Sequence, residues 1–182
     1  MKTILITGGS GGLGSAVVPR LERDYRCILL KRNPVVSPDD APYHALVMLA
    51  GGFAMGNAWN EMIEANLMSA TRALDAALPH LADGGRIVAI SSAATLSHPA
   101  GLAAYVATKS ALNAIVKTLA SELAPRKITA NALLPTSLDT PVMREMMPRD
   151  QLVPLDRVAE WIAFLLSERG DGVTGQLIAL SA

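Results

Sequence analysis

Short apolar runs alternate with longer stretches of helical periodicity along the whole chain. Each run has five to seven residues and is rich in aliphatic side chains, which is typical of strands buried in a parallel sheet. The runs lie at residues 3–7, 26–30, 45–49, 86–91, 128–134 and 176–180. Apolar residues recur at helical spacing at residues 13–23, 58–81, 103–124 and 156–168. The alternation predicts an α/β fold with a doubly wound, mostly parallel sheet, in a single domain over residues 1–182.

Composition narrows the class of protein further. Of the 182 residues, 51% are apolar and 18% are charged, which excludes a disordered chain. Sixteen basic residues balance sixteen acidic ones, so no excess of charge favours nucleic acid or an anionic membrane. The single cysteine, Cys27, excludes an internal disulfide, and neither a signal peptide nor an apolar run of membrane-spanning length is evident. We therefore expect a cytoplasmic protein that binds neither nucleic acid nor membrane.

A glycine-rich turn follows the first apolar run. Five of the seven residues from Gly8 to Gly14 are glycine, and a helix is predicted to begin directly after them. Glycines let the backbone approach a phosphate closely, and the N-terminus of the following helix offers free N–H groups and a positive dipole. The turn therefore predicts a dinucleotide site, although an ordinary glycine-rich turn between strand and helix is the alternative. The residues expected to contact the cofactor here are Gly8, Ser10, Gly11, Gly12, Leu13 and Gly14.

The end of the second apolar run indicates which dinucleotide is bound. Enzymes that use NAD usually carry an Asp or Glu there, which hydrogen-bonds the 2′-hydroxyl of the ribose. This chain has Leu30-Lys31-Arg32-Asn33 at that point, with two cations and no acid. Cations suit a 2′-phosphate, and an arginine can bind it through two hydrogen bonds. We therefore expect Lys31 and Arg32 to bind the cofactor, and NADP(H) to be preferred over NAD(H).

A tyrosine and a lysine are placed to act together near the start of the third helical stretch. Tyr105 and Lys109 are four residues apart, so they share one face of the helix. A nearby cation favours the phenolate, which predicts a lowered pKa for Tyr105 and a role as general acid. Ser91 and Ser92 end the fourth apolar run, at the edge of the sheet where ligands of such folds bind. Taken alone, each feature could be a surface coincidence or a helix cap.

Together with the glycine turn, these motifs are distinctive. In chain order they are Thr7-Gly8-x-x-x-Gly12-x-Gly14, Ala50-Gly51, Asn66-Leu67, Ile90-Ser91-Ser92, Tyr105-x-x-x-Lys109, Pro135 with Thr140, and Thr174-Gly175. The sequence thus resembles the short-chain dehydrogenase/reductase family, whose members are NAD(P)-dependent oxidoreductases with a Rossmann sheet. The resemblance extends from Thr3 to about Leu180, and the family's spacing selects Ser92 rather than Ser91.

The resemblance implies a role for each site residue. Tyr105 would protonate the carbonyl oxygen of a substrate while the cofactor supplies a hydride, and Ser92 would orient that oxygen. Lys109 would bind the nicotinamide ribose and lower the pKa of the tyrosine, and Asn66 would hold a water that links Lys109 to solvent. Thr140 would bind the carboxamide of the cofactor. Ala50, Gly51 and Pro135 complete the expected cofactor site.

One segment is too short for the family. Members place a helix, a strand and a second helix between the second and third of the runs described above, whereas here only Asn33 to His44 are available. A single crossover with its helix already needs about ten to twelve residues. The sheet should therefore lack its usual third strand and the flanking helices, which leaves the strand at 26–30 on the edge and removes one wall of the adenine pocket.

Three readings of the function follow. The leading one is an NAD(P)H-dependent reductase or dehydrogenase that acts on a small carbonyl or hydroxyl substrate. A dihydropteridine reductase-like enzyme is an alternative, because segments 50–58 and 134–141 resemble that branch, although the branch typically lacks the serine found at position 92. A catalytically weak dinucleotide-binding or scaffold protein is the alternative from another class, suggested by the shortened segment.

The remaining features concern assembly and other sites. In the family, the counterparts of helices 58–81 and 103–124 pair across a twofold axis, so we expect a homodimer or homotetramer. The histidines show no metal-ligand spacing, and no metal site is expected. Asp139 either caps the helix that follows it or faces a substrate.

Overall fold

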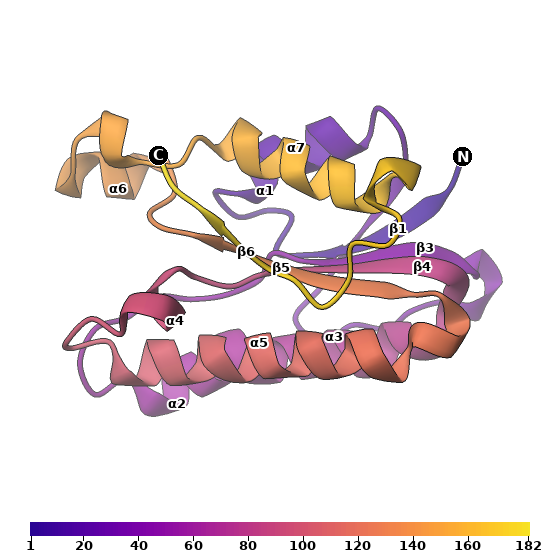
Figure 1. Ribbon diagram of the computed structural model, residues 1–182, viewed down its shortest axis with the longest axis horizontal. Coiled ribbons are helices and arrows are strands. Elements are labelled where there is room, and N and C mark those ends of the chain that lie inside the picture. The colour runs from indigo at the N-terminus through magenta and orange to yellow at the C-terminus, as the bar shows by residue number, and fades with distance from the viewer.

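A computed structural model describes residues 1–182 and contains one six-stranded sheet with the order β2-β1-β3-β4-β5-β6 (Figure 1). All neighbouring strands are parallel. The strands are β1 Thr3–Thr7, β2 Arg26–Leu30, β3 Tyr43–Met48, β4 Leu81–Ile90, β5 Thr129–Pro135 and β6 Leu177–Leu180. The predicted doubly wound fold is therefore confirmed, and the strands lie where the apolar runs predicted them, apart from their exact ends.

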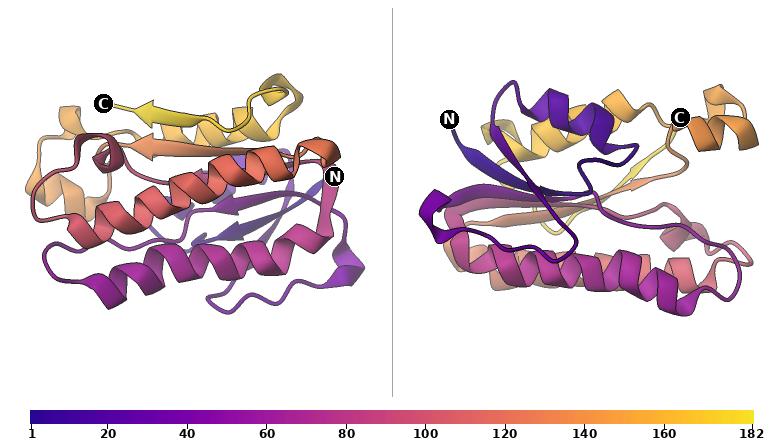
Figure 2. Two further views of the ribbon diagram at one scale, coloured as in Figure 1. Left: turned by 60° about the horizontal axis from the view of Figure 1, so that its bottom comes forward. Right: turned by 180° about the vertical axis from the view of Figure 1, so that it is seen from behind.

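Helices cover both faces of the sheet. Figure 1 shows α1 and α7 on one face and α2, α3 and α5 on the other, and the views in Figure 2 agree. The first layer consists of α1 Gly14–Leu21 and α7 Leu155–Leu166. The second consists of α2 Trp59–Met62, the π-helical turn η2 Ile63–Met68, α3 Ser69–Ala77 and α5 Ala103–Glu122. The short helices are α4 Ala94–Ser97, α6 Pro141–Met146 and the 3-10 turns Pro38–Asp40, Leu78–His80, Ala124–Arg126, Arg149–Gln151 and Glu168–Gly170.

Two apolar cores lie on opposite sides of the sheet. Alternate residues of each strand point to opposite faces, so Ile4 and Ile6 pack against the layer of α1 and α7 while Leu5 packs against the layer of α3 and α5. All six residues of β3 are buried. This two-sided burial explains why the strands read as continuous apolar runs rather than as alternating ones. No helix of the structure combines the length and the apolar character needed to span a membrane.

Two predicted boundaries were wrong. The stretch 58–81 is not one α-helix, because a π-helical turn at Ile63–Met68 interrupts it and a 3-10 turn ends it. The fourth strand begins at Leu81 rather than at residue 86. The pairing with β3 shifts register in this part of the strand, and Gly84 has a φ of +72°. Irregular pairing of this kind leaves no periodic signal in the sequence.

The usual third strand is absent, as the length of the segment predicted. Residues 33–42 contain only the 3-10 turn Pro38–Asp40, and β2 lies at the edge of the sheet. An ion pair of 2.9 Å between Arg26 and Asp40 and a hydrogen bond of 2.6 Å from the Tyr43 hydroxyl to the Ser37 carbonyl hold this connection. These contacts anchor the short connection of residues 33–42 to β2 and β3, in the place where the family has a further strand and its two flanking helices.

Candidate active site

The glycine turn packs tightly against the segment that follows β3. Gly8 has a φ of +68°, and a Cβ atom placed on it would lie 2.5 Å from the backbone nitrogen of Ala50. A Cβ on Gly14 would lie 2.1 Å from the carbonyl oxygen of Gly9. No side chain fits at either position, so the glycines are needed for close approach of backbone to backbone. The turn is thereby held at the carboxyl ends of β1 and β3.

Free hydrogen-bond donors line this turn. The backbone N–H groups of Ser10, Gly12 and Leu13 donate to no acceptor within the protein. They precede α1, whose N-terminus carries no side-chain cap. Unpaired N–H groups at the start of a helix, together with its dipole, favour an anion. The turn therefore has the donor set that a pyrophosphate requires.

Ser92 and Tyr105 are brought together at the end of β4. Ser92 is the second residue after that strand, and Tyr105 is the third residue of α5. The Ser92 hydroxyl lies near enough to the phenol to lower the pKa of Tyr105, but burial of the ring raises it more, and the result lies above the usual value for tyrosine. The predicted lowering by Lys109 was therefore wrong for this geometry, because Lys109 makes no contribution and burial is the main cause.

The two adjacent serines point in different directions. The Ser91 hydroxyl donates to the backbone carbonyl of Lys109 at 3.4 Å, inside the layer between sheet and helix. The Ser92 hydroxyl accepts a hydrogen bond of 3.2 Å from the backbone N–H of Ala94 and meets Tyr105. The structure thus places Ser92, and not Ser91, beside the phenol.

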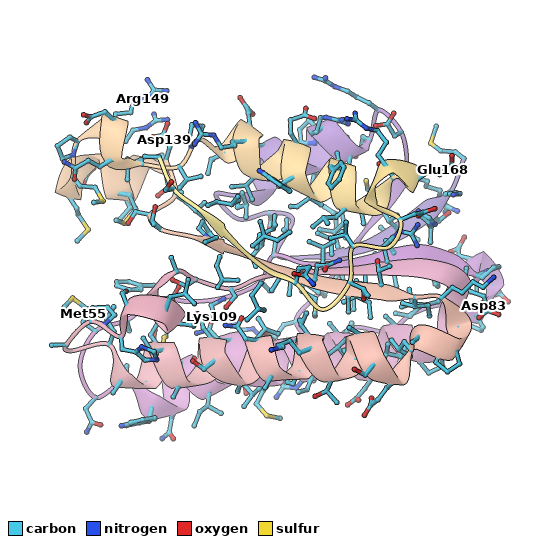
Figure 3. All side chains as sticks on the ribbon, viewed as in Figure 1. Met55, Asp83, Lys109, Asp139, Arg149 and Glu168 are labelled. Carbon is cyan, nitrogen blue, oxygen red and sulfur yellow. The ribbon has the colours of Figure 1, made fainter.

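Lys109 is buried between α5 and the sheet (Figure 3). It is 5% exposed, and its Nζ atom donates to the carbonyl oxygen of Ile90 at 2.9 Å. Burial lowers the pKa of Lys109 to about 8, because no carboxylate compensates for the lost hydration of the ammonium. A Cβ on Gly51 would lie only 2.9 Å from this Nζ, so the residue after Ala50 must be glycine if Lys109 is to stay there.

The Asn66 side chain binds the backbone of a neighbouring loop. Its Oδ1 atom accepts from the N–H of Gly52 at 3.0 Å, and its Nδ2 atom donates to the carbonyl of Gly52 at 3.1 Å and to the Thr108 hydroxyl at 3.3 Å. The residue lies in the π-helical turn, a feature often found at functional sites. The side-chain amide therefore has partners other than the water that the sequence analysis assigned to it.

Phe53 is a site residue that the sequence analysis did not identify. Its ring meets the ring of Tyr105 edge to face at a centroid distance of 5.1 Å, and it is 56% exposed. Met55 is 64% exposed and lies near Gly101, whose carbonyl accepts a hydrogen bond of 2.8 Å from Gly56. Figure 3 shows Met55 at the same end of the molecule as α4. The only sequence feature that indicated these exposed apolar residues was the position of an aromatic residue directly after the glycines at positions 51 and 52.

The segment after β5 bends back toward the glycine turn. A Cβ on Gly12 would lie 3.3 Å from the methyl group of Thr140, so Pro135 and Thr140 bring this segment over the expected pyrophosphate site. The Thr140 hydroxyl caps α6 by accepting from the N–H of Met143 at 3.4 Å. Thr140 therefore takes the capping role that was considered for Asp139.

The carboxylate of Asp139 binds two arginines instead. It pairs with Arg144 at 2.5 Å and with Arg149 at 3.2 Å (Figure 3). These hydrogen bonds lower the pKa of Asp139. The pairs tie α6 and the following turn to the end of β5, and Asp139 is not free to meet a substrate.

Lys31 and Arg32 follow the edge strand β2 and are exposed. Neither forms an ion pair with any acid of the protein. They stand beside the glycine turn because β2 and β1 are neighbours in parallel register, with Thr7 opposite Leu30. The two cations are therefore available to a phosphate near the turn.

Comparison with known proteins agrees with this arrangement. A family model described as enoyl-(acyl carrier protein) reductase matches residues 54–182. The chain is 32% identical to a dihydropteridine reductase of Dictyostelium discoideum, over 87% of this chain and 85% of that protein. It is 26% identical to a 3-oxoacyl-[acyl-carrier-protein] reductase of Aggregatibacter actinomycetemcomitans, over 99% and 98% of the two chains.

Solved structures share the fold. A blue fluorescent protein from a metagenomic library, determined in complex with NADPH, superposes with a TM-score of 0.85 at 26% identity, over 98% of this chain and 96% of that one. A short-chain dehydrogenase of Burkholderia cenocepacia in complex with NADP superposes with a TM-score of 0.83 at 27% identity, over the same shares. Because the family model and the relatives match and the sheet order and glycine turn agree with them, this chain belongs to the short-chain dehydrogenase/reductase family of NAD(P)-dependent oxidoreductases.

Proposed function

We propose that this protein is an NADPH-dependent reductase of a small carbonyl compound, with Tyr105 as the general acid. The observation that carries the proposal is the placement of the Ser92 hydroxyl beside the Tyr105 phenol, with the buried Lys109 one helical turn further along α5. These groups converge at the end of the sheet where the glycine turn offers its free N–H groups. Ligands of open α/β sheets bind at this end.

Each residue has a role in the proposed reaction. The nicotinamide of the bound cofactor supplies the hydride. The Tyr105 hydroxyl donates its proton to the carbonyl oxygen of the substrate, and Ser92 donates a hydrogen bond to the same oxygen and orients it. Because the pKa of Lys109 is about 8, its side chain is largely protonated at neutral pH and can bind the ribose hydroxyls next to Tyr105. Asn66 keeps the loop at Gly52 in place through two hydrogen bonds to its backbone.

The preference for NADPH is supported by Lys31 and Arg32. Both are exposed and unpaired at the end of β2, and no acidic residue stands in the Leu30–Asn33 segment. An unpaired arginine can bind a 2′-phosphate through two hydrogen bonds. The NADPH and NADP complexes of the two structural relatives support the same assignment.

A quinonoid pterin is the second candidate substrate. The relative from Dictyostelium discoideum is named a dihydropteridine reductase, and the exposed Phe53 ring beside Tyr105 offers an aromatic contact to a flat heterocycle. Ser92 remains the feature that favours a carbonyl substrate.

Two measurements test the proposal. Fluorescence titration should show NADPH binding more tightly than NADH, and absence of NADPH binding at millimolar concentration would overturn the proposed function. Turnover of an aliphatic ketone, an aromatic quinone and a quinonoid dihydropterin should then be compared under identical conditions. Oxidation of NADPH by the pterin alone would favour the second candidate over the first.

We also propose that two copies associate through the layer of α2, α3 and α5. Trp59, Ile63 and Met68 expose between 38% and 44% of their surface there, which is unusual for large apolar residues on one helical segment. Sedimentation should give at least a dimer at micromolar concentration, and a monomer at that concentration would contradict this proposal.

A further inference from the structure

A third residue continues the stripe of α5 that carries Tyr105 and Lys109. Asn113 lies one further helical turn along, and residues four apart on a helix share a face. It is 8% exposed, and its Nδ2 atom donates to the Thr95 hydroxyl at 3.0 Å. This bond reaches from α5 to α4, the short helix that follows the end of β4.

Thr95 passes the contact on to Ser92. Its hydroxyl donates to the backbone carbonyl of Ser92 at 2.8 Å. A threonine hydroxyl has only one hydrogen. Because Thr95 donates that hydrogen to the Ser92 carbonyl, its hydroxyl oxygen can only accept a hydrogen bond from Asn113. This requirement fixes the orientation of the Asn113 amide, with the NH₂ group toward Thr95. The Oδ1 atom is then left buried with no partner.

The unpartnered oxygen argues against a role in packing alone. A buried amide oxygen without a hydrogen bond destabilises the folded protein, whereas a leucine, with the same number of side-chain heavy atoms, buries no polar group. The side-chain amide contributes one thing that leucine lacks, which is the hydrogen bond to Thr95. Exceptions of this kind are expected where geometry at a functional site matters more than stability.

We propose that Asn113 is a positioning residue that holds the turn of Ser92 against the helix carrying Tyr105, and so sets the contact between the two hydroxyls. The other contacts between α5 and this end of β4 are made by residues before Ser92. Lys109 Nζ donates to the Ile90 carbonyl at 2.9 Å, and the Ser91 hydroxyl reaches the Lys109 carbonyl at the long distance of 3.4 Å. The N–H of Ala93 binds the Pro135 carbonyl at 3.0 Å, which ties the turn to β5 rather than to α5. The inference rests on the proposed role of Ser92 and Tyr105.

The state of the Tyr105 hydroxyl provides a test that needs no substrate. The pKa of Tyr105 depends on burial and on the nearby Ser92 hydroxyl, and Lys109 on the same helix directs its Nζ atom to Ile90 instead. The chain has three tyrosines, so isotope-labelled Cζ atoms give three NMR signals, and that of Tyr105 is the one lost in Tyr105→Phe. Its chemical shift and titration can be followed from neutral pH to about pH 12 in the NADP complex, because the pKa already lies above the usual value for tyrosine.

Four variants decide the question. Ser92→Ala removes the hydroxyl beside the phenol and should raise the pKa of Tyr105 by about one unit. Asn113→Leu keeps the number and branching of the side-chain heavy atoms but removes the donor, and should raise that pKa by about half as much. The double variant should show no larger shift than Ser92→Ala alone, because both substitutions act through one contact. Asn131→Leu is the matched control, since Asn131 of β5 is a buried amide with its own partners, the Val173 carbonyl and the Gln176 N–H.

The outcomes are distinguishable. A shift in Ser92→Ala with none in Asn113→Leu would overturn the positioning role while leaving the proposed function intact. The absence of a shift in both would overturn the contact between Ser92 and Tyr105, and the inference with it. A shift of equal size in Asn131→Leu would show that any loss of stability moves the signal, and this too would refute the role of Asn113.

Discussion

The proposed catalytic corner differs from the proposed cofactor edge in how its side chains are held. The corner consists of the end of β4 with η2, α4 and α5, and the edge consists of β2 and residues 31–42. In the corner, Asn66, Ser92 and Lys109 are each at most 5% exposed, and each is hydrogen-bonded to another element. At the edge, Lys31 and Arg32 are exposed and form no ion pair. The shortened segment thus removes support from the cofactor edge and leaves the catalytic corner complete. Chemistry and cofactor affinity should therefore respond to different substitutions.

The largest effect is expected in the corner. Tyr105→Phe removes the proposed proton donor and should lower kcat by about a thousandfold. The free donors of the glycine turn lie between β1 and α1, away from Tyr105, so the Kd for NADPH should stay within about twofold of the wild-type value. Stopped-flow turnover and fluorescence titration measure the two quantities. Unchanged turnover in the variant would remove Tyr105 from the mechanism.

Gly51→Ala tests how closely the corner is packed. The new Cβ atom would lie 2.8 Å from Oδ1 of Asn66 and 2.9 Å from Nζ of Lys109, so one of them must move. Displacement of a catalytic group by about an ångström lowers kcat by about a hundredfold. Gly84→Ala is the control, because a Cβ there meets nothing within 4 Å while its φ of +72° brings backbone strain alone. If both variants kept the wild-type kcat, the corner would be more adaptable than its packing indicates.

The buried lysine gives the corner a pH dependence that the edge lacks. Above pH 8 the folded protein loses the proton of Lys109, whereas the unfolded chain keeps it until about pH 10.4. The unfolded state then binds more protons, so this group makes the free energy of unfolding rise between about pH 8 and pH 9.5, by about 1 to 2 kcal/mol. Urea unfolding should show this rise in the wild type and not in Lys109→Met. The exposed Lys31→Met is the control and should keep the wild-type dependence, and parallel curves for all three proteins would refute the burial argument.

The smallest effect is expected at the edge. Arg32→Ala should weaken NADPH binding by about tenfold and leave NADH binding unchanged, because only NADPH carries the 2′-phosphate. Arg23→Ala, an exposed arginine beyond the end of α1, is the matched control. Isothermal titration with both cofactors measures the difference. An equal loss of affinity for NADPH and NADH would mean that Arg32 does not bind the 2′-phosphate.

Much of the fold could be predicted from the sequence, because the apolar runs and the lengths of the segments between them are local features. The runs at 3–7 and 26–30 match β1 and β2 residue for residue. β1 is buried on both faces and therefore reads as a continuous apolar segment, whereas the edge strand β2 keeps an apolar run although it is only partly buried. The missing strand followed from the length of the segment between Asn33 and His44. The π-helical turn at Ile63–Met68 and the early start of β4 could not be predicted, since both depend on contacts with other elements.

The site divides in the same way. The spacing of Tyr105 and Lys109 and the glycines of the turn determined which residues meet, because helix period and backbone sterics are local properties. Only the tertiary structure decided what each group does there. Burial, and not Lys109, controls the pKa of Tyr105, and the amide of Asn66 binds Gly52 across fourteen residues of chain. Asn113 reaches Thr95 across eighteen. Desolvation and such long-range hydrogen bonds arise only when the packed layers bring distant segments together.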